Sequence, residues 1–201
     1  MAVVDVKDIF RSFANQRGLA DASGQVVDAL TPLLARCEGQ RLDPALHGEL
    51  PGGFPALVGH LRFEGGQAAG AVTFAVVITR VAESAALAPR LFCETHDDPA
   101  GSTGFEHDDD SRWTENAALA RRYEIRTSPY QDRDWMRQLF SPVFIDWLLS
   151  EPPPGFSFEL AYGDLVASLR RDAPVVGDLE ALWETTARVA GVLRRSSEDE
   201  L

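Results

Sequence analysis

The pattern of apolar and polar positions is clearest between residues 120 and 195. Apolar residues that alternate with charged ones over 122–127 predict a half-buried strand. Alternating aromatic and aliphatic residues predict two further strands, over 156–160 and 165–169. The intervening Tyr162-Gly163-Asp164 is typical of a hairpin turn, so these two strands should pair with each other.

The same region should contain three amphipathic helices. A short one over 132–140 is followed by Ser141-Pro142, which places a capping hydroxyl and then a proline at a helix start. The Pro-Pro-Pro-Gly run at 152–155 ends this second helix. A longer apolar stripe over 179–193 predicts a closing helix, with acidic residues near its start and arginines near its end, as the helix dipole favours.

In the first half, apolar residues at helical spacing predict a helix over 6–13 that Gly18 stops. A second helical pattern over 26–34 contains Pro32, so the helix either kinks there or restarts with Thr31 as its cap. Glycine and proline are frequent over 38–56, which indicates a loop that leads into a sheet.

A run of β-forming segments follows, and it predicts a hairpin or meander with one buried face. The expected strands are 57–63, 71–81 and 91–95, and a glycine turn at 64–67 joins the first two. Residues 97–112 are acidic and contain little apolar surface, which indicates an exposed, mobile loop.

These elements predict an α+β fold in which one or two antiparallel sheets are covered by helices. At 201 residues the chain fits a single domain spanning 1–201. Within it we expect two sequential α/β halves, a first half over 1–96 and a second half over 113–195. The acidic loop at 97–112 separates them, and a frayed tail occupies 196–201.

The formal net charge of −12 limits the classes of partner. An acidic chain without a basic patch is repelled by nucleic acid and by anionic membrane surfaces, so neither is expected to bind directly. Acidic residues near the start do not fit a secretory signal, and the most apolar stretch, 68–78, is too short to cross a bilayer. We therefore expect a cytoplasmic protein in which Cys37 and Cys93 are free thiols.

Several short phrases of the sequence resemble a known family. They include Phe13-Ala14-Asn15-Gln16-Arg17-Gly18 in the first helix, a hairpin around 59–74, Ser141-Pro142 followed by Trp147-Leu148-Leu149, and Tyr162-Gly163-Asp164-Leu165. The layout is similar to the DUF3137-like group, bacterial and common in actinobacteria, whose members are domains of unknown function. The matching positions are caps, turns and core residues, so the resemblance implies a fold and no activity.

Metal binding is one hypothesis, because carboxylates and imidazoles gather around 94–110. The first group is Glu94, His96, Asp97 and Asp98, and the second is Glu106, His107, Asp108, Asp109 and Asp110. Such groups can bind a divalent cation, and Glu94 and His96 would share one strand face. No helical HxxxH pattern fixes them, which favours a solvated acidic loop and no metal site.

Other catalytic arrangements find equally little support, so no catalytic or cofactor-binding residue is predicted. Cys93 and His96 are close in sequence, but no strained nucleophile turn or GxSxG motif is present. Glu151 with Glu159, or Asp132 with Asp134, could form general acid–base pairs. The sequence contains no Walker or dinucleotide-binding motif, and His47 and His60 are isolated, at expected surface or loop positions.

Aromatic residues of the second half suggest either a core or a binding surface. Trp135, Phe140, Phe144 and Trp147 could line a ligand pocket between two helices and the sheet, although core packing explains them as well. Trp113 stands in a polar stretch, so it either folds back or is an exposed binding anchor.

Three functions follow from these observations. The leading hypothesis is a non-enzymatic module that works through a protein partner or as a homodimer. The second is a small-molecule-binding domain whose pocket is lined by the helices at 132–149. The third is a metal-dependent hydrolase that uses the region of His96 and His107.

Overall fold

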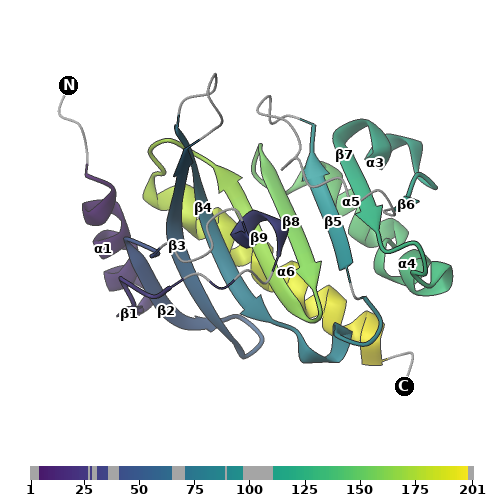
Figure 1. Cartoon of the computed structure of the whole chain (residues 1–201), viewed down its shortest axis with the longest axis horizontal. Helices are drawn as coiled ribbons and strands as arrows, with labels where there is room; N and C mark the ends of the chain where they lie inside the picture. Colours follow the sequence, from purple (N-terminus) through teal and green to yellow (C-terminus); the bar gives the residue numbers. More distant parts are fainter. Residues whose placement is uncertain are drawn as a thin grey trace.

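The computed structural model describes residues 5–26, 28, 31–35, 41–64, 71–88, 90–96 and 111–198. Nine strands of the described chain form one antiparallel sheet in the order β1-β2-β3-β4-β9-β8-β5-β7-β6 (Figure 1). Their bounds are β1 Ala20–Asp21, β2 Ala45–Leu50, β3 Phe54–Glu64, β4 Ala71–Arg80, β5 Arg90–Thr95, β6 Ser111–Arg112, β7 Tyr123–Thr127, β8 Phe156–Ala161 and β9 Asp164–Arg170.

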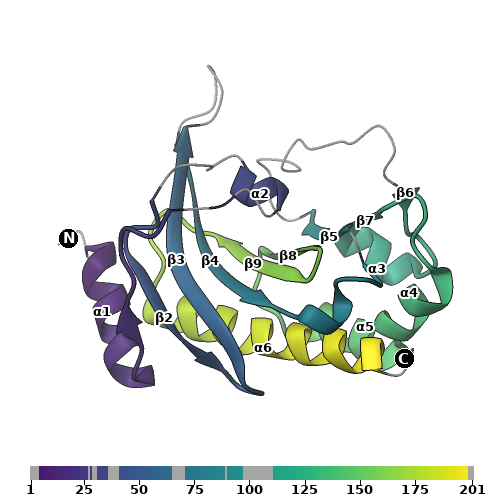
Figure 2. The ribbon, with the colours of Figure 1, turned by 60° about the horizontal axis from the view of Figure 1, so that its bottom comes forward.

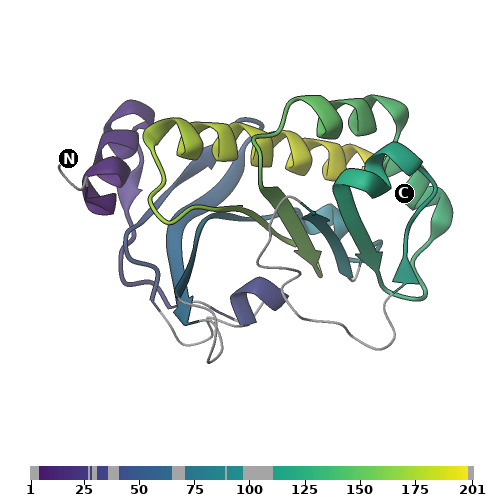
Figure 3. The same ribbon diagram turned by 90° about the horizontal axis from the view of Figure 1, so that it is seen from above.

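Helices cover the two faces of the sheet unequally. The helices are α1 Val6–Arg17, α2 Pro32–Ala35, α3 Ala117–Arg122, α4 Arg133–Leu139, α5 Pro142–Ser150 and α6 Val176–Glu198, with a 3-10 turn, η1, at Ala82–Ser84. Figure 3 shows α1, α6, α5 and α3 along one side of the strands and the short α2 on the other. We call these sides the helical face and the α2 face. The α+β class expected from the sequence is confirmed.

Strands distant in sequence lie side by side in this sheet. The β8–β9 hairpin is inserted between β4 and β5, so that β9 pairs with β4 and β8 pairs with β5 (Figure 1). Its side chains are almost all buried on both faces, as expected for central strands. The two sequence halves therefore share one continuous sheet, and β5 lies between strands of the second half.

Local sequence signals set the ends of several elements. Helix α1 begins where the Asp5 carboxylate accepts a 2.9 Å hydrogen bond from the Lys7 backbone N–H, and it ends at Gly18 in a left-handed conformation with φ of 67°. The β8–β9 turn places Tyr162 and Gly163 at positive φ, which explains the glycine there.

Two apolar clusters form the core, one on each face. The larger lies under α1, α3, α4, α5 and α6 and includes Phe13, Trp135 and Trp183. The smaller lies on the α2 face, where Leu33 and Leu34 of α2 pack over β3, β4 and β9. Alternation along each strand divides the residues between the two clusters.

Several sequence expectations require correction. The segment 38–56, expected as a loop, contains β2 and the start of β3. The strand at 91–95 exists as β5, but it pairs with β7 and β8 and does not continue a meander from β4. Ser111 and Arg112, expected in the acidic loop, form β6.

Two further boundaries differ from expectation. The pattern over 26–34 restarts at Pro32 as α2, while Val26 makes an isolated bridge with Arg41. Helix α6 continues to Glu198, so residues 196–198 belong to it although a frayed tail was expected. The glycine turn at 65–67, residues 97–110 of the acidic loop and residues 199–201 lie outside the described residues.

Among the residues that the structure describes, no helix has both the length and the apolar content needed to cross a membrane.

Candidate interaction site

Helix α5 has one buried side and one exposed side. Pro142 stands in its first turn, as the sequence predicted, although Ser141 makes no side-chain capping hydrogen bond. Phe144, Trp147 and Leu148 turn inward and are at most 4% exposed. Val143 points outward and remains 74% exposed.

Helix α6 lies beside α5 in the helical layer (Figures 2 and 3). Leu179, Leu182, Trp183 and other apolar residues face the sheet and are buried. Arg188, Val192 and Arg195 are spaced by four and three residues, so they lie on one side of the helix, towards α5.

Two adjoining grooves separate the two helices, and Arg188 lines both of them. We call them together the α5–α6 groove. The first part has a volume of about 570 Å³ and is lined by Pro51, Trp147, Glu151, Pro153, Ala181, Glu184, Thr185, Ala187 and Arg188. The second part has a volume of about 430 Å³ and is lined by Gln138, Ser141, Val143, Phe144, Arg188, Val192, Arg195 and Ser196.

Charge is distributed differently in the two parts of this groove. In the first part, Glu151 lies 3.5 Å from the Arg188 guanidinium, and Glu184 lies 2.6 Å from that of Arg17. The second part is lined by two arginines and by no acidic residue of the described chain. Arg188 and Arg195 are both exposed, so this part presents two guanidinium groups to solvent.

Arg188 also shapes the wall between the two parts. Its guanidinium carbon lies 4.9 Å from the centre of the Trp147 ring, within cation–π distance. The side chain remains 46% exposed, so it can still donate hydrogen bonds to a bound molecule. The groove thus combines an aromatic floor with accessible guanidinium groups.

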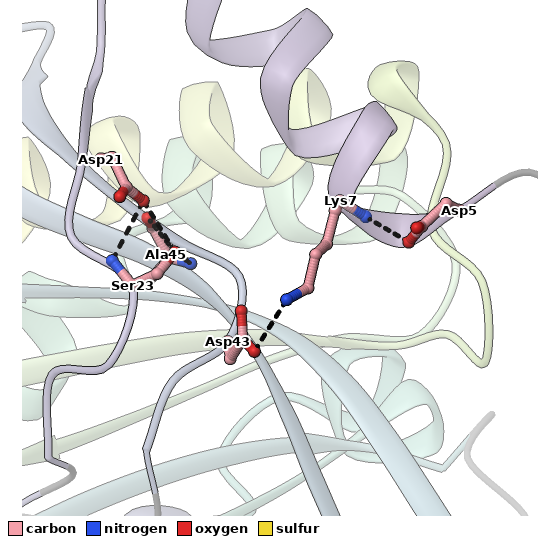
Figure 4. Close-up of polar contacts among 6 residues, drawn as sticks. All are labelled: Asp5, Lys7, Asp21, Ser23, Asp43 and Ala45. Atoms are coloured by element: carbon pink, nitrogen blue, oxygen red, sulfur yellow. Dashed lines mark hydrogen bonds and ion pairs between the residues drawn. The ribbon is translucent and has the colours of Figure 1, made fainter.

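A further groove, of about 460 Å³, lies at the opposite end of the sheet, between α1 and strands β1 and β2. Figure 4 shows its polar groups: Lys7 Nζ lies 3.0 Å from Asp43 Oδ2, and the Ser23 hydroxyl donates to Asp21 over 2.7 Å. Hydrogen bonds from the Ser23 side chain and backbone lower the pKa of the Asp21 carboxyl. These charges compensate one another, so the corner is explained by local structure.

Of the residues in the metal-binding hypothesis, the structure describes Glu94 and His96, which lie in different environments. Glu94 is buried on the α2 face, where its Oε2 accepts a 3.0 Å hydrogen bond from Arg126 Nη2. His96 is exposed, with its Nε2 3.3 Å from the Ala120 carbonyl oxygen. Asp97, Asp98 and residues 106–110 lie outside the described residues, and no group of three metal-binding side chains occurs in the described part.

Cys93, which was considered as a nucleophile and not predicted as one, is fully buried on the helical face. Burial, together with the charge of Glu94, raises the pKa of its thiol well above the ordinary value. A reactive cysteine needs the thiolate and access to solvent, and Cys93 has neither. It does not form a dyad with the exposed His96.

The carboxylates considered as acid–base pairs have structural roles instead. Asp132 caps α4 by accepting hydrogen bonds from two backbone N–H groups, and Asp134 pairs with Arg137 at 2.9 Å. Glu159 is buried on the α2 face, where it accepts a 3.0 Å hydrogen bond from the Leu33 N–H. Glu151 lies at the end of α5 on the helical side, so the structure does not bring it together with Glu159.

The aromatic residues divide between core and groove. Trp135 and Phe140 are buried in the core, and Trp113 is half-buried and stacks on Phe140 with ring centres 4.8 Å apart. The hypothesis of Trp113 as an exposed anchor is therefore wrong. Phe144 and Trp147 are largely buried, but they also line the α5–α6 groove.

Sequence reasoning missed the outward residues of this groove, Val143, Arg188 and Arg195. Helical spacing could have placed the two arginines on one side of α6, but it could not show that α5 lies opposite.

The histidines also differ from one another: His47 is exposed on β2, while His60, expected at the surface or in a loop, is half-buried on β3.

The fold defines a class of protein built on one long antiparallel sheet with helices concentrated on one face. No protein-family model matches the chain, and no curated protein is significantly similar in sequence. Among solved structures, the crystal structure of the mycobacterial trehalose monomycolate transport factor A, TtfA, has a TM-score of 0.63 and covers 95% of both chains. At 11% sequence identity this likeness shows a shared fold alone.

Proposed function

We propose that the chain is a non-enzymatic, cytoplasmic interaction module that binds a protein partner in the α5–α6 groove. The observation that carries this proposal is Val143, which is 74% exposed on the wall of a groove with an aromatic floor. An apolar side chain that borders a preformed groove can be removed from water by an apolar group of a partner, which favours binding.

The composition of the groove supports a macromolecular partner. Its two parts follow one another along α6, from Ala181 to Ser196, a span of about 22 Å at the rise of an α-helix. A surface of this length suits a segment of a partner chain that lies along the helices. Apolar residues in the centre and arginines at the edge match the usual arrangement of protein interfaces.

The roles of the other sequence candidates also support a binding function over an enzymatic one. Glu94, Asp132 and Glu159 are engaged in an ion pair, a helix cap and a backbone hydrogen bond. The structural neighbour is described as a transport factor, a description that names no chemical reaction. We also propose that the chain is related to the DUF3137-like group.

A small-molecule-binding domain is the second candidate, because α4 and α5 contribute to the part of the groove with a volume of about 430 Å³. That volume is within the range of ligand pockets. However, the positive charge is at the exposed rim, whereas a specific pocket usually directs polar groups towards an enclosed ligand.

Site-specific photo-cross-linking would test the proposal. A photoreactive amino acid replaces Val143 in the full chain, and the matched control carries it at Tyr162, which is 64% exposed in the β8–β9 turn. We expect one protein to be cross-linked from position 143 and absent from position 162. Replacing the half-buried Val192, which lines the same part of the groove, by the larger Trp should abolish that product.

Three other outcomes are informative. A product that joins two copies of this chain would identify a homodimer at the groove. A metabolite that co-purifies with the wild type and is lost on Val143→Trp would favour the small-molecule alternative. The same set of products from positions 143 and 162 would contradict the proposal.

A further inference from the structure

We infer that the α5–α6 groove selects an acidic, amphipathic segment of its partner, with two carboxylates about 10 Å apart on either side of an apolar patch. This inference rests on the proposed function and specifies the chemistry of the partner. It follows from the positions of Arg188, Val192 and Arg195 opposite Val143 and Phe144.

The spacing of the two arginines determines the spacing of the carboxylates. Arg188 and Arg195 are seven residues apart on α6, which corresponds to about two helical turns and about 10.5 Å along the axis. Seven residues return to nearly the same side of an α-helix, so both guanidinium groups can reach one bound segment. A helical partner would match them with acidic residues at positions i and i+7.

Charge complementarity favours an acidic occupant here. The chain as a whole has a net charge of −12, yet the second part of the groove is lined by arginines and by no acidic residue of the described chain. Guanidinium groups bind carboxylates through two parallel hydrogen bonds, which adds geometric selectivity to the attraction. A basic partner would be repelled by the two guanidinium groups in this part of the groove.

The two arginines should not contribute equally. Arg188 is already 3.5 Å from Glu151 and lies over Trp147, so part of its charge is compensated. Arg195 lies at the other end of this part of the groove, and its side chain is exposed. Reversal of the charge at Arg195 should therefore weaken binding more than reversal at Arg188.

The apolar centre of the segment is specified by the residues between the arginines. Val192 is one turn from each arginine along α6, and Val143 and Phe144 lie across from it. A leucine or phenylalanine midway between the two carboxylates would cover Val143, and burial of that apolar surface would supply most of the affinity.

A display library of helix-forming 16-residue peptides would test this inference. All members carry the same apolar stripe, and all positions outside this stripe are random. The library is selected against the wild-type chain, against Arg188→Glu/Arg195→Glu and against Val143→Glu. With the wild type we expect enrichment of Asp or Glu at two positions seven residues apart. With the charge-reversed variant the enriched residues at those positions should become Lys or Arg.

A selected peptide, labelled with a fluorophore, gives the magnitude. Its Kd, from fluorescence anisotropy, should rise about tenfold on Arg195→Glu and less on Arg188→Glu. Arg133→Glu, an equal charge change at an exposed position of α4 outside the groove, is the matched control and should leave the Kd unchanged.

The outcomes separate this inference from the function on which it rests. Peptides that require Val143 but carry no acidic pair, or that keep their charge preference with the reversed variant, would overturn the acidic specificity and leave the groove as a binding site. Failure to select any peptide that depends on Val143 would overturn both.

Discussion

The helical face and the α2 face of the sheet are stabilised in different ways. On the helical face, one apolar cluster extends from Phe13 of α1 to Trp135 of α4 and is closed by the long helix α6. The α2 face has a smaller apolar cluster under β3, β4 and β9, and an ion pair between Glu94 and Arg126 under β5 and β7. The Arg126 guanidinium also lies 5.7 Å from the centre of the Phe92 ring.

This difference shows that the two faces of one sheet can contribute differently, one to the size of the stabilisation and the other to the choice of a single arrangement. Apolar packing on the helical face is non-directional and gives a large stabilisation that tolerates exchange between residues of similar volume. A buried ion pair contributes little net stability, because desolvation offsets the attraction, but it disfavours arrangements that separate its partners. We therefore expect truncations on the helical face to lower the free energy of unfolding the most. On the α2 face, the loss should depend on which partner of the ion pair is removed.

The largest loss should follow Trp183→Ala. Trp183 is 2% exposed and contacts Phe13 edge to face, with ring centres 6.0 Å apart. Removal of the ring leaves a cavity between α6, α1 and β2, so the free energy of unfolding should fall by about 3–5 kcal/mol. Urea denaturation measures the change, and Val175→Ala, at a residue 59% exposed, is the control, with an effect within about 0.5 kcal/mol.

A smaller but more diagnostic effect is expected on the α2 face. Arg126→Met removes the guanidinium that lies 3.0 Å from Glu94 and leaves a buried carboxylate with less compensation, so unfolding should become easier by about 3 kcal/mol. The double variant Glu94→Met/Arg126→Met should recover part of that loss, because the buried Glu94 carboxylate is removed together with its partner. A double variant as unstable as the single one would contradict this account.

The same contrast explains what the sequence could predict. Helix α6 and the β8–β9 hairpin follow from local patterns, since the Leu179–Leu193 stripe and the Tyr162-Gly163 turn are complete within each segment. Strand β2 was missed because Gly48 and the nearby Pro51-Gly52-Gly53 are typical of loops. The position of β5 between β7 and β8 depends on contacts with residues 28 or more positions away, which no local pattern encodes.

The candidate site depends even more on such distant contacts. The groove exists because α5 and α6, separated by the β8–β9 hairpin, lie next to each other. Sequence reasoning identified Phe144 and Trp147 as residues of a core or a pocket, and both descriptions hold in part. It could not identify Val143, because a single apolar residue in a helix gives no indication of its exposure.

His60 provides a test of the helical face that depends on pH. It lies opposite Ala75, a residue of the helical-face cluster, and its Nε2 is buried with no hydrogen-bond partner among the described residues. Burial, aided by the charge of Arg62, lowers the pKa of His60, while a backbone interaction with Arg171 opposes this shift.

The unfolded chain therefore binds a proton at His60 more readily than the folded chain. Stability from this residue is fully present above the unfolded pKa of about 6.5 and is lost as the pH falls below it. Urea denaturation of the wild type and of His60→Gln between pH 5 and 8 measures the effect. The difference between the two curves should be level above about pH 6.5 and should change below it, with the wild type losing more stability. Parallel curves throughout would show that His60 is not kept neutral by burial.

The smallest effect is expected at the corner between α1 and β2, where the structure brings opposite charges together in water. Lys7 and Asp43 are 3.0 Å apart, but their side chains are 57% and 51% exposed. Solvent screens such a pair, so Lys7→Met should change the free energy of unfolding by less than about 0.5 kcal/mol in denaturant titrations at low salt. A loss above about 1 kcal/mol, which is the upper limit for exposed pairs, would mean that the Lys7–Asp43 contact fixes α1 on the sheet edge. The Lys7–Asp43 pair would then stabilise the sheet edge as the Glu94–Arg126 pair stabilises the α2 face. Stabilisation by ion pairs would no longer be confined to the α2 face.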